Sequence, residues 1–105
     1  MIIDYARKEV EKICNDENYA RRFFPRHKVV EDLKVLMTRL KNMEKFSVFF
    51  QEPLMSKYHT KELKGDKKGI YSLRVSHKDR MELIVKYAEP EDEIKILEVR
   101  GHYGE

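Results

Sequence analysis

The sequence predicts an α+β fold in which an N-terminal helical pair packs on a small antiparallel β-sheet. Apolar residues recur at helical spacing in the first half of the chain, and from Gly69 onward they alternate with polar residues, as in half-buried strands. The breaks between the alternating runs are short and carry turn residues, which favours hairpins over crossover connections. Helices followed by strands are typical of an α+β domain in which the helices cover one face of the sheet.

The composition suits one domain spanning residues 1–105. With 41% hydrophobic and 39% charged residues, the chain can bury one modest core under a heavily charged surface. The single cysteine, Cys14, excludes an intrachain disulfide framework and a cysteine-rich zinc site, and it points to the cytoplasm. No apolar run approaches the length of a membrane span and no signal-peptide pattern is present, so we expect no membrane association.

The first element that we expect is a short edge strand over residues 1–5. Asp4 is suited to cap a helix that runs through residues 10–14. The pair Asn15 and Asp16 then interrupts this helix or starts a further helical turn.

The second helix is predicted by a regular apolar stripe. Pro25 suits its first helical position. The stripe follows i, i+3, i+4, i+7 spacing and consists of Val29, Val30, Leu33, Leu36, Met37, Leu40 and Met43. The connection over residues 46–55 is less regular, and we expect Phe49, Phe50 or Leu54 to enter the helix–sheet core. An exposed partner-binding patch is the alternative.

Three successive strands account for the alternating run and form a meander. Their core-facing residues are Tyr71, Leu73 and Val75, then Met81, Leu83, Val85 and Tyr87, then Leu97 and Val99. Residues 76–79 and residues 88–92 form the two breaks and carry turn chemistry.

The opposite face of the same strands gathers charged side chains. Its members are Ser72, Arg74, Arg80, Glu82, Ile84, Ile96, Glu98 and Arg100. A three-residue loop over residues 77–79 sets Arg74 opposite Glu82 and brings His102 near Arg80. Three arginines and a histidine then share one sheet surface. The alternative is a solvated face that holds cross-strand ion pairs.

Positive charge is concentrated in residues 56–80. The whole chain carries a net charge of +3, whereas this segment holds eight Lys or Arg against three acids. A local cationic segment suggests a polyanionic partner, of which nucleic acid is the commonest in cytoplasm. A solvated lysine-rich loop is the alternative. The sequence contains no glycine-rich phosphate loop, no metal-ligand spacing and no Ser-His-Asp order, so we expect neither a metal nor a cofactor.

Several sequence elements together resemble a known family. They are residues 63–73 (LKGDKKGIYSL), residues 80–84 (RMELI), residues 10–17 (VEKICNDE) and the late strand that ends in His102. This combination resembles the HigB (plasmid maintenance system killer) branch of the RelE/ParE toxin superfamily. The resemblance implies a RelE/ParE-like toxin of a type II toxin–antitoxin module that cleaves mRNA, typically in the ribosomal A site. Its implied partners are mRNA, the ribosome and a HigA-like helix-turn-helix antitoxin.

The resemblance also implies which residues act. Metal-free RNA cleavage by a 2′-hydroxyl needs a proton acceptor, a proton donor and cations for the charge that builds on phosphorus. Arg80, His102 and His59 match the family's catalytic positions. Residues implied to hold the RNA backbone are Lys57, Lys64, Lys67, Lys68, Arg74 and Arg100, and Tyr71 or Tyr103 is suited to stack on a base.

Functions from other classes remain open on the sequence alone. Many relatives end in Asp-Tyr-His, whereas Arg100 and Gly101 precede His102 here. The arginine and histidine pair favours catalysis, and the missing Asp-Tyr pair favours binding only. A non-catalytic ParE-like topoisomerase inhibitor, an inactive RNA- or ribosome-binding relative and a general RNA-binding accessory protein are therefore the alternatives.

Overall fold

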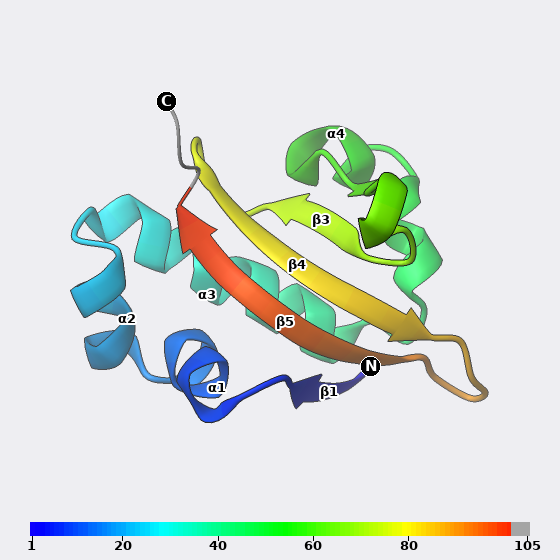
Figure 1. Cartoon of the computed structure of the whole chain (residues 1–105), viewed down its shortest axis with the longest axis horizontal. Helices are drawn as coiled ribbons and strands as arrows, with labels where there is room; N and C mark the ends of the chain where they lie inside the picture. The colour runs from blue at the N-terminus through cyan, green and yellow to red at the C-terminus, as the bar shows by residue number, and fades with distance from the viewer. Residues whose placement is uncertain (102–105) are drawn as a thin grey trace.

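The computed structural model describes residues 1–101 and confirms the α+β class. Its elements in chain order are β1 (Ile2–Tyr5), α1 (Lys8–Asn15), α2 (Glu17–Phe23), α3 (His27–Asn42), η1 (Phe46–Phe50), α4 (Leu54–Tyr58), β2 (Lys61–Glu62), η2 (Gly65–Lys67), β3 (Tyr71–Arg74), β4 (Asp79–Lys86) and β5 (Glu93–Gly101). Five strands form one sheet in the order β1-β5-β4-β3-β2, and α3 runs behind it (Figure 1). The opposite face of the sheet is the one on which the charged residues gather.

The sheet is mixed rather than wholly antiparallel. Strands β3, β4 and β5 pair antiparallel, as the short turns predict, and the unpredicted strand β2 pairs antiparallel with β3. The predicted N-terminal edge strand is present, but it runs parallel to β5. Parallel pairing requires a long crossover between the two strands, and the whole helical region lies between β1 and β5 in the chain.

The core lies between α3 and the sheet. Six of the seven predicted stripe residues of α3 are buried, and Met43 caps the helix end half-buried. They meet Leu73, Met81 and Leu83, which are fully buried on β3 and β4. From the connection, Phe46, Phe49 and Leu54 enter this core, whereas Phe50 is partly exposed. Burying each such side chain stabilises the fold by about 1.5–3 kcal/mol.

The helix boundaries differ from the sequence prediction in two places and agree with it in one. Asp4 lies within β1 instead of capping a helix, because its pairing with β5 keeps this segment extended, and α1 begins only at Lys8. The predicted interruption is confirmed, since the Asp16 carboxylate accepts from the Tyr19 N–H at 3.1 Å and caps a separate helix α2. Pro25 precedes α3 rather than starting it. Because α2 is separate from α1, the three helices α1, α2 and α3 replace the predicted pair.

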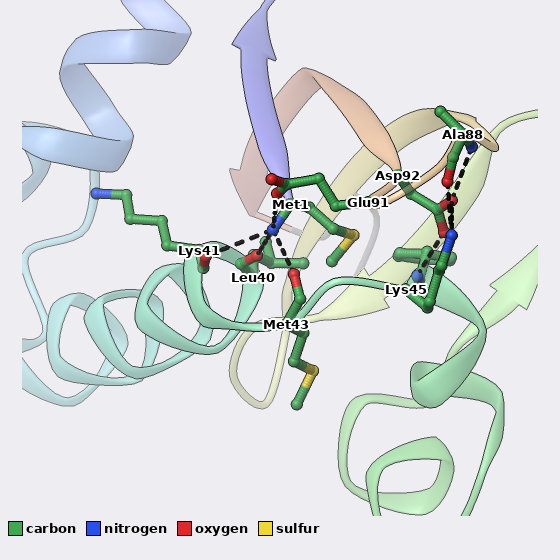
Figure 2. Close-up of polar contacts among 9 residues, drawn as sticks. Met1, Leu40, Lys41, Met43, Lys45, Ala88, Glu91 and Asp92 are labelled. Atoms are coloured by element: carbon green, nitrogen blue, oxygen red, sulfur yellow. Dashed lines mark hydrogen bonds and ion pairs between the residues drawn. The ribbon is translucent and has the colours of Figure 1, made fainter.

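The β4–β5 turn is fastened by a buried carboxylate. Asp92 accepts from the backbone N–H of Phe46 at 2.8 Å and of Ala88 at 3.0 Å, and Lys45 Nζ lies 3.8 Å away (Figure 2). Burial raises the pKa of Asp92, but the two N–H donors outweigh it and leave the pKa below its usual value. A buried charge with this many partners fixes the turn against η1.

The Met1 amino group lies beside that turn. It donates to the carbonyls of Leu40 at 3.3 Å and Lys41 at 3.4 Å and to that of Met43, and it pairs with the Glu91 carboxylate at 3.2 Å (Figure 2). These carbonyls end α3, where a cation also meets the negative end of the helix dipole. The contact joins α3 to the sheet.

The β3–β4 register differs from the predicted one by two residues. Arg74 pairs with Arg80, and Ser72 takes the place opposite Glu82 that was predicted for Arg74. The Val75 N–H donates to the Asp79 carbonyl at 2.8 Å, so β4 begins sooner than a loop over residues 77–79 allows. A shift of two residues preserves the face on which every side chain lies.

A bulge in β5 changes which residues of that strand face the core. The pairing with β4 slips by one between Glu82 and Leu83, leaving Leu97 as the extra residue. Alternation therefore restarts there, and Ile96 is fully buried instead of lying on the charged face as predicted. Glu98 and Arg100 remain on the charged face.

Candidate functional site

Three arginines lie side by side on the charged face of the sheet. Arg74 of β3 pairs with Arg80 of β4, and Arg80 pairs with Arg100 of β5. Directly opposed residues of antiparallel strands have their Cα atoms about 4.5–5.5 Å apart. Like charges in such positions destabilise a sheet, so the row favours the binding of an anion.

The carboxylates of this face do not neutralise the row. Glu82 Oε2 accepts from Arg100 at 3.4 Å and lies 3.9 Å from Lys67 Nζ. Glu98 is held by Arg7 through contacts of 2.9 and 3.0 Å. Within residues 1–101, no carboxylate lies within 4 Å of Arg74 or Arg80. These two guanidinium groups are therefore the centre of the candidate site.

His59 completes the centre from the C-terminal end of α4. Its Nε2 lies 3.2 Å from Nη1 of Arg74. An arginine only donates, so His59 must accept this bond as a neutral imidazole with its proton on Nδ1. The backbone of His59 is left-handed, with φ 46° and ψ 48°. This conformation costs a non-glycine residue on the order of 1 kcal/mol and directs the ring toward the arginines.

A hollow of about 570 Å³ opens at this centre, and we call it the site hollow. Its lining residues are Met55, Ser56, His59, Thr60, Lys61, Arg74 and Arg80. Three buried polar atoms of this group, Thr60 Oγ1, Arg74 Nε and Arg80 Nη1, have no partner in the part of the chain that the structure describes. Such atoms are rare away from functional sites. The hollow combines fixed positive charge with a neutral imidazole, which suits a phosphodiester.

Solved structures of three other proteins share this architecture. YafQ from E. coli strain BL21(DE3) matches with a TM-score of 0.63 at 20% identity over 97% of each chain. The YoeB/ParE toxin from Agrobacterium tumefaciens matches with a TM-score of 0.60 at 20% identity, covering 98% of this chain and all of that one. The fold is that of the YoeB and YafQ toxins. YoeB in the YoeB–YefM complex from Staphylococcus aureus also matches, with a TM-score of 0.57 at 20% identity over 98% of each chain. No family model matches the sequence, and no curated protein does.

Three predicted RNA-binding lysines of this YoeB-like fold lie on or beside one loop. Lys64, Lys67 and Lys68 surround η2, where Gly65 has a φ of 71° that a side chain would strain. The contact of Lys67 with Glu82 places this loop over the charged face of the sheet. The structure therefore brings the loop to the edge of the arginine row.

Lys57 and Tyr71 lie elsewhere. Lys57 Nζ sits 5.6 Å from the Tyr58 ring centre on α4, beside the site hollow but not in it. Tyr71 packs against Phe46 at 5.4 Å between ring centres, on the core side of β3. Its hydroxyl lies 3.3 Å from that of Tyr87, whose pKa this bond and burial raise to about 12. The structure does not bring Tyr71 to the arginine row.

Of the predicted site residues near the C-terminus, the structure describes only Arg100. His102 and Tyr103 lie outside the described residues. The described chain ends at Gly101, which pairs with Asp79, the residue before Arg80. The sequence placed Arg80 and Arg100 on one face correctly, and the pairing now puts them directly opposite each other.

Sequence reasoning missed two contributors to the site. Thr60 and Lys61 line the site hollow because the two-residue strand β2 pairs with β3 and sets Lys61 opposite Ser72. Two residues are too few for a periodic pattern, so only the basic character of this segment signalled them.

Residues 1–101 contain neither a membrane-spanning helix nor a metal-ligand cluster. No helix there is long and apolar enough to cross a membrane. That part of the chain has no cluster of three or more His, Cys, Asp or Glu side chains placed to hold a metal ion.

Proposed function

We propose that this chain is the toxin of a type II toxin–antitoxin module and a metal-independent mRNA endonuclease. The observation that carries the proposal is the Arg74 and Arg80 pair, which has no carboxylate partner within residues 1–101 and stands beside a neutral imidazole. The fold shared with YoeB and YafQ supports it. We further propose one toxin domain over residues 1–105, of the HigB branch, acting in the cytoplasm on ribosome-bound mRNA.

The chemistry is an in-line attack by a ribose 2′-hydroxyl on the adjacent phosphorus. The 2′-oxygen loses its proton and bonds to phosphorus while the bond to the 5′-oxygen breaks, and that oxygen gains a proton. The products are a 2′,3′-cyclic phosphate and a free 5′-hydroxyl. His59 is assigned the first proton transfer, for which its Nε2 must release the Arg74 N–H and take the 2′-hydroxyl in its place, and His102 is assigned the second.

The arginines stabilise the charge that builds on the phosphoryl oxygens. Arg80 and Arg74 present fixed guanidinium groups on a rigid sheet, so little reorganisation is needed in the transition state. Glu82 orients Arg100 through their 3.4 Å contact and keeps that third guanidinium at the end of the row. Lys64, Lys67 and Lys68 hold the neighbouring phosphates of the message.

An antitoxin is the expected protein partner. YoeB from Staphylococcus aureus has been solved in complex with YefM. For this chain we propose a HigA-like helix-turn-helix antitoxin, following the resemblance of the sequence to the HigB branch.

A non-catalytic toxin is the second candidate. The observation that favours it is Arg100-Gly101 in the place of the Asp-Tyr pair that precedes the last histidine in many relatives. Such a chain would use the arginine row for docking alone, as a ParE-like topoisomerase inhibitor or an inactive ribosome-binding relative.

Expression of the chain in growing cells distinguishes the two candidates. The nuclease should arrest growth and deplete translated mRNA, and the purified protein should cut a message on ribosomes to leave 5′-hydroxyl ends. Growth arrest with intact mRNA and induced DNA-damage signalling would select the topoisomerase inhibitor instead.

A further inference from the structure

A second hollow adjoins the site hollow on the other side of Arg74. It has a volume of about 530 Å³ and lies between the start of α3, the end of α4 and the β3–β4 turn. Arg74 lines both hollows, so the two are joined at the centre of the candidate site. We call it the flanking hollow.

Cations dominate the flanking hollow. Lys28 contacts Asp32, the only carboxylate among the described residues of the lining, at 3.0 Å, and Arg26 contacts the buried Asp79 at 3.3 Å. Lys57 rests over the Tyr58 ring and has no carboxylate within 4 Å among residues 1–101. Together with Arg74, this leaves an excess of positive charge that a polyanion would neutralise.

We infer that the flanking hollow binds the phosphates of the RNA strand that continues beyond the scissile bond, with Lys28 and Lys57 as its contacts. This inference rests on the proposed nuclease function. A strand held in the site hollow continues into the flanking hollow, because the two hollows adjoin at Arg74, which lines both.

The chemistry of the walls favours RNA over an acidic peptide. An acidic peptide that folds onto a groove as an amphipathic helix needs apolar anchor pockets. Tyr58 and Val75 are buried, at 3% and 5% exposure, which leaves Val35 as the one exposed apolar side chain that the part of the lining within residues 1–101 contains. A phosphodiester backbone needs cations and no apolar anchors.

The test compares two double variants of the full chain. Lys28→Gln/Lys57→Gln removes two charges from the flanking hollow. Lys8→Gln/Lys41→Gln removes two exposed charges from α1 and from the far end of α3, and serves as the matched control. The probes are 2′-O-methyl RNAs of about four and about twelve nucleotides, which bind but cannot be cut, together with an oligoglutamate peptide.

The flanking-hollow variant should bind the long RNA roughly tenfold more weakly than the control and the short RNA equally well. The slope of its log affinity for the long RNA against log salt concentration should fall in magnitude by about 1.4, because each single-strand phosphate contact contributes about 0.7.

Equal binding of the long RNA by both variants would overturn the inference while leaving the nuclease intact. Lysine-dependent binding of oligoglutamate, without such dependence for RNA, would assign the hollow to an acidic protein instead. Failure of the wild-type chain to bind the long RNA would also overturn the inference, whereas failure to cut a ribosome-bound message would refute the proposed function itself.

Discussion

The charged side chains at the two ends of the β4–β5 pair differ in their burial and in their partners. At the turn end, Asp92 is buried at 2% exposure and its oxygens accept from two backbone N–H groups near a lysine. At the other end, Arg74 and Arg80 face each other half-exposed, with no carboxylate within 4 Å in residues 1–101. A buried charge with its partners fixed stabilises the fold. Adjacent unpaired cations weaken the sheet, and that cost is expected where a ligand supplies the missing charge.

The largest effect should follow loss of His102, the proposed proton donor, or of Arg80 in the arginine row. We expect His102→Ala and Arg80→Ala each to lower cleavage at least about a hundredfold, the usual scale for an acid–base group or a preorganised charge. The thermal midpoint of Arg80→Ala should stay within a few degrees, because a partly exposed charged position contributes under about 1 kcal/mol. The double variant should be little worse than the worse single one if both groups serve one transition state. Full activity in His102→Ala would remove it from the mechanism.

Substitutions at His59 test whether this residue, whose backbone is left-handed, is needed for RNA cleavage. His59→Asn retains a residue that tolerates the left-handed backbone but has no imidazole, so unfolding free energy should change by less than about 1 kcal/mol. Cleavage should fall by about a hundredfold if the imidazole moves a proton. His59→Gly is the matched control for the backbone and should behave the same way. Normal cleavage by both variants would show that His59 ends helix α4 and has no part in cleavage.

Substitution of Asp92 should have the opposite effect, because it should lower the stability of the fold and leave RNA cleavage unchanged. Asp92→Asn turns one acceptor into a donor that faces a backbone N–H, and leaving such a buried group unpaired costs about 1–3 kcal/mol. The pKa of Asp92 is lowered in the folded chain, so its contribution is present above the unfolded pKa of about 4 and is lost as the pH falls below it. Urea titrations at neutral and acid pH should show this loss in the wild type and a flatter profile in the variant. A variant as stable as the wild type at neutral pH would contradict the assigned role.

The lysines around η2 should have the smallest effect. Replacing Lys64, Lys67 and Lys68 with Gln should weaken RNA or ribosome binding roughly tenfold and lower the salt slope by about 2, with little change in stability. Binding measured across a range of salt concentrations checks both quantities. If the affinity for RNA and its salt dependence do not change, these lysines are solvated side chains that do not contact RNA.

The sequence was sufficient for features that depend on periodicity. The apolar stripe of α3 and the alternation in β3 and β4 placed Arg74 and Arg80 on one face, and the two-residue register error left that face unchanged. The bulge at Leu97 carries no such signal, because one extra residue in a strand does not alter local composition. The contact between His59 and Arg74 joins residues 15 apart through a left-handed helix end, which pattern alone does not reveal.

The most direct test compares two arginines of the same chain that differ in their partners. Arg80→Gln removes a guanidinium of the row that has no carboxylate within 4 Å in residues 1–101, whereas Arg7→Gln removes a guanidinium outside the row that Glu98 neutralises. Cleavage of a ribosome-bound message and the thermal midpoint should be measured for both. We predict that Arg80→Gln cuts at least about a hundredfold more slowly with an unchanged midpoint, and that Arg7→Gln cuts normally. Equal cleavage by the two variants would contradict the assignment of the arginine row as the functional site.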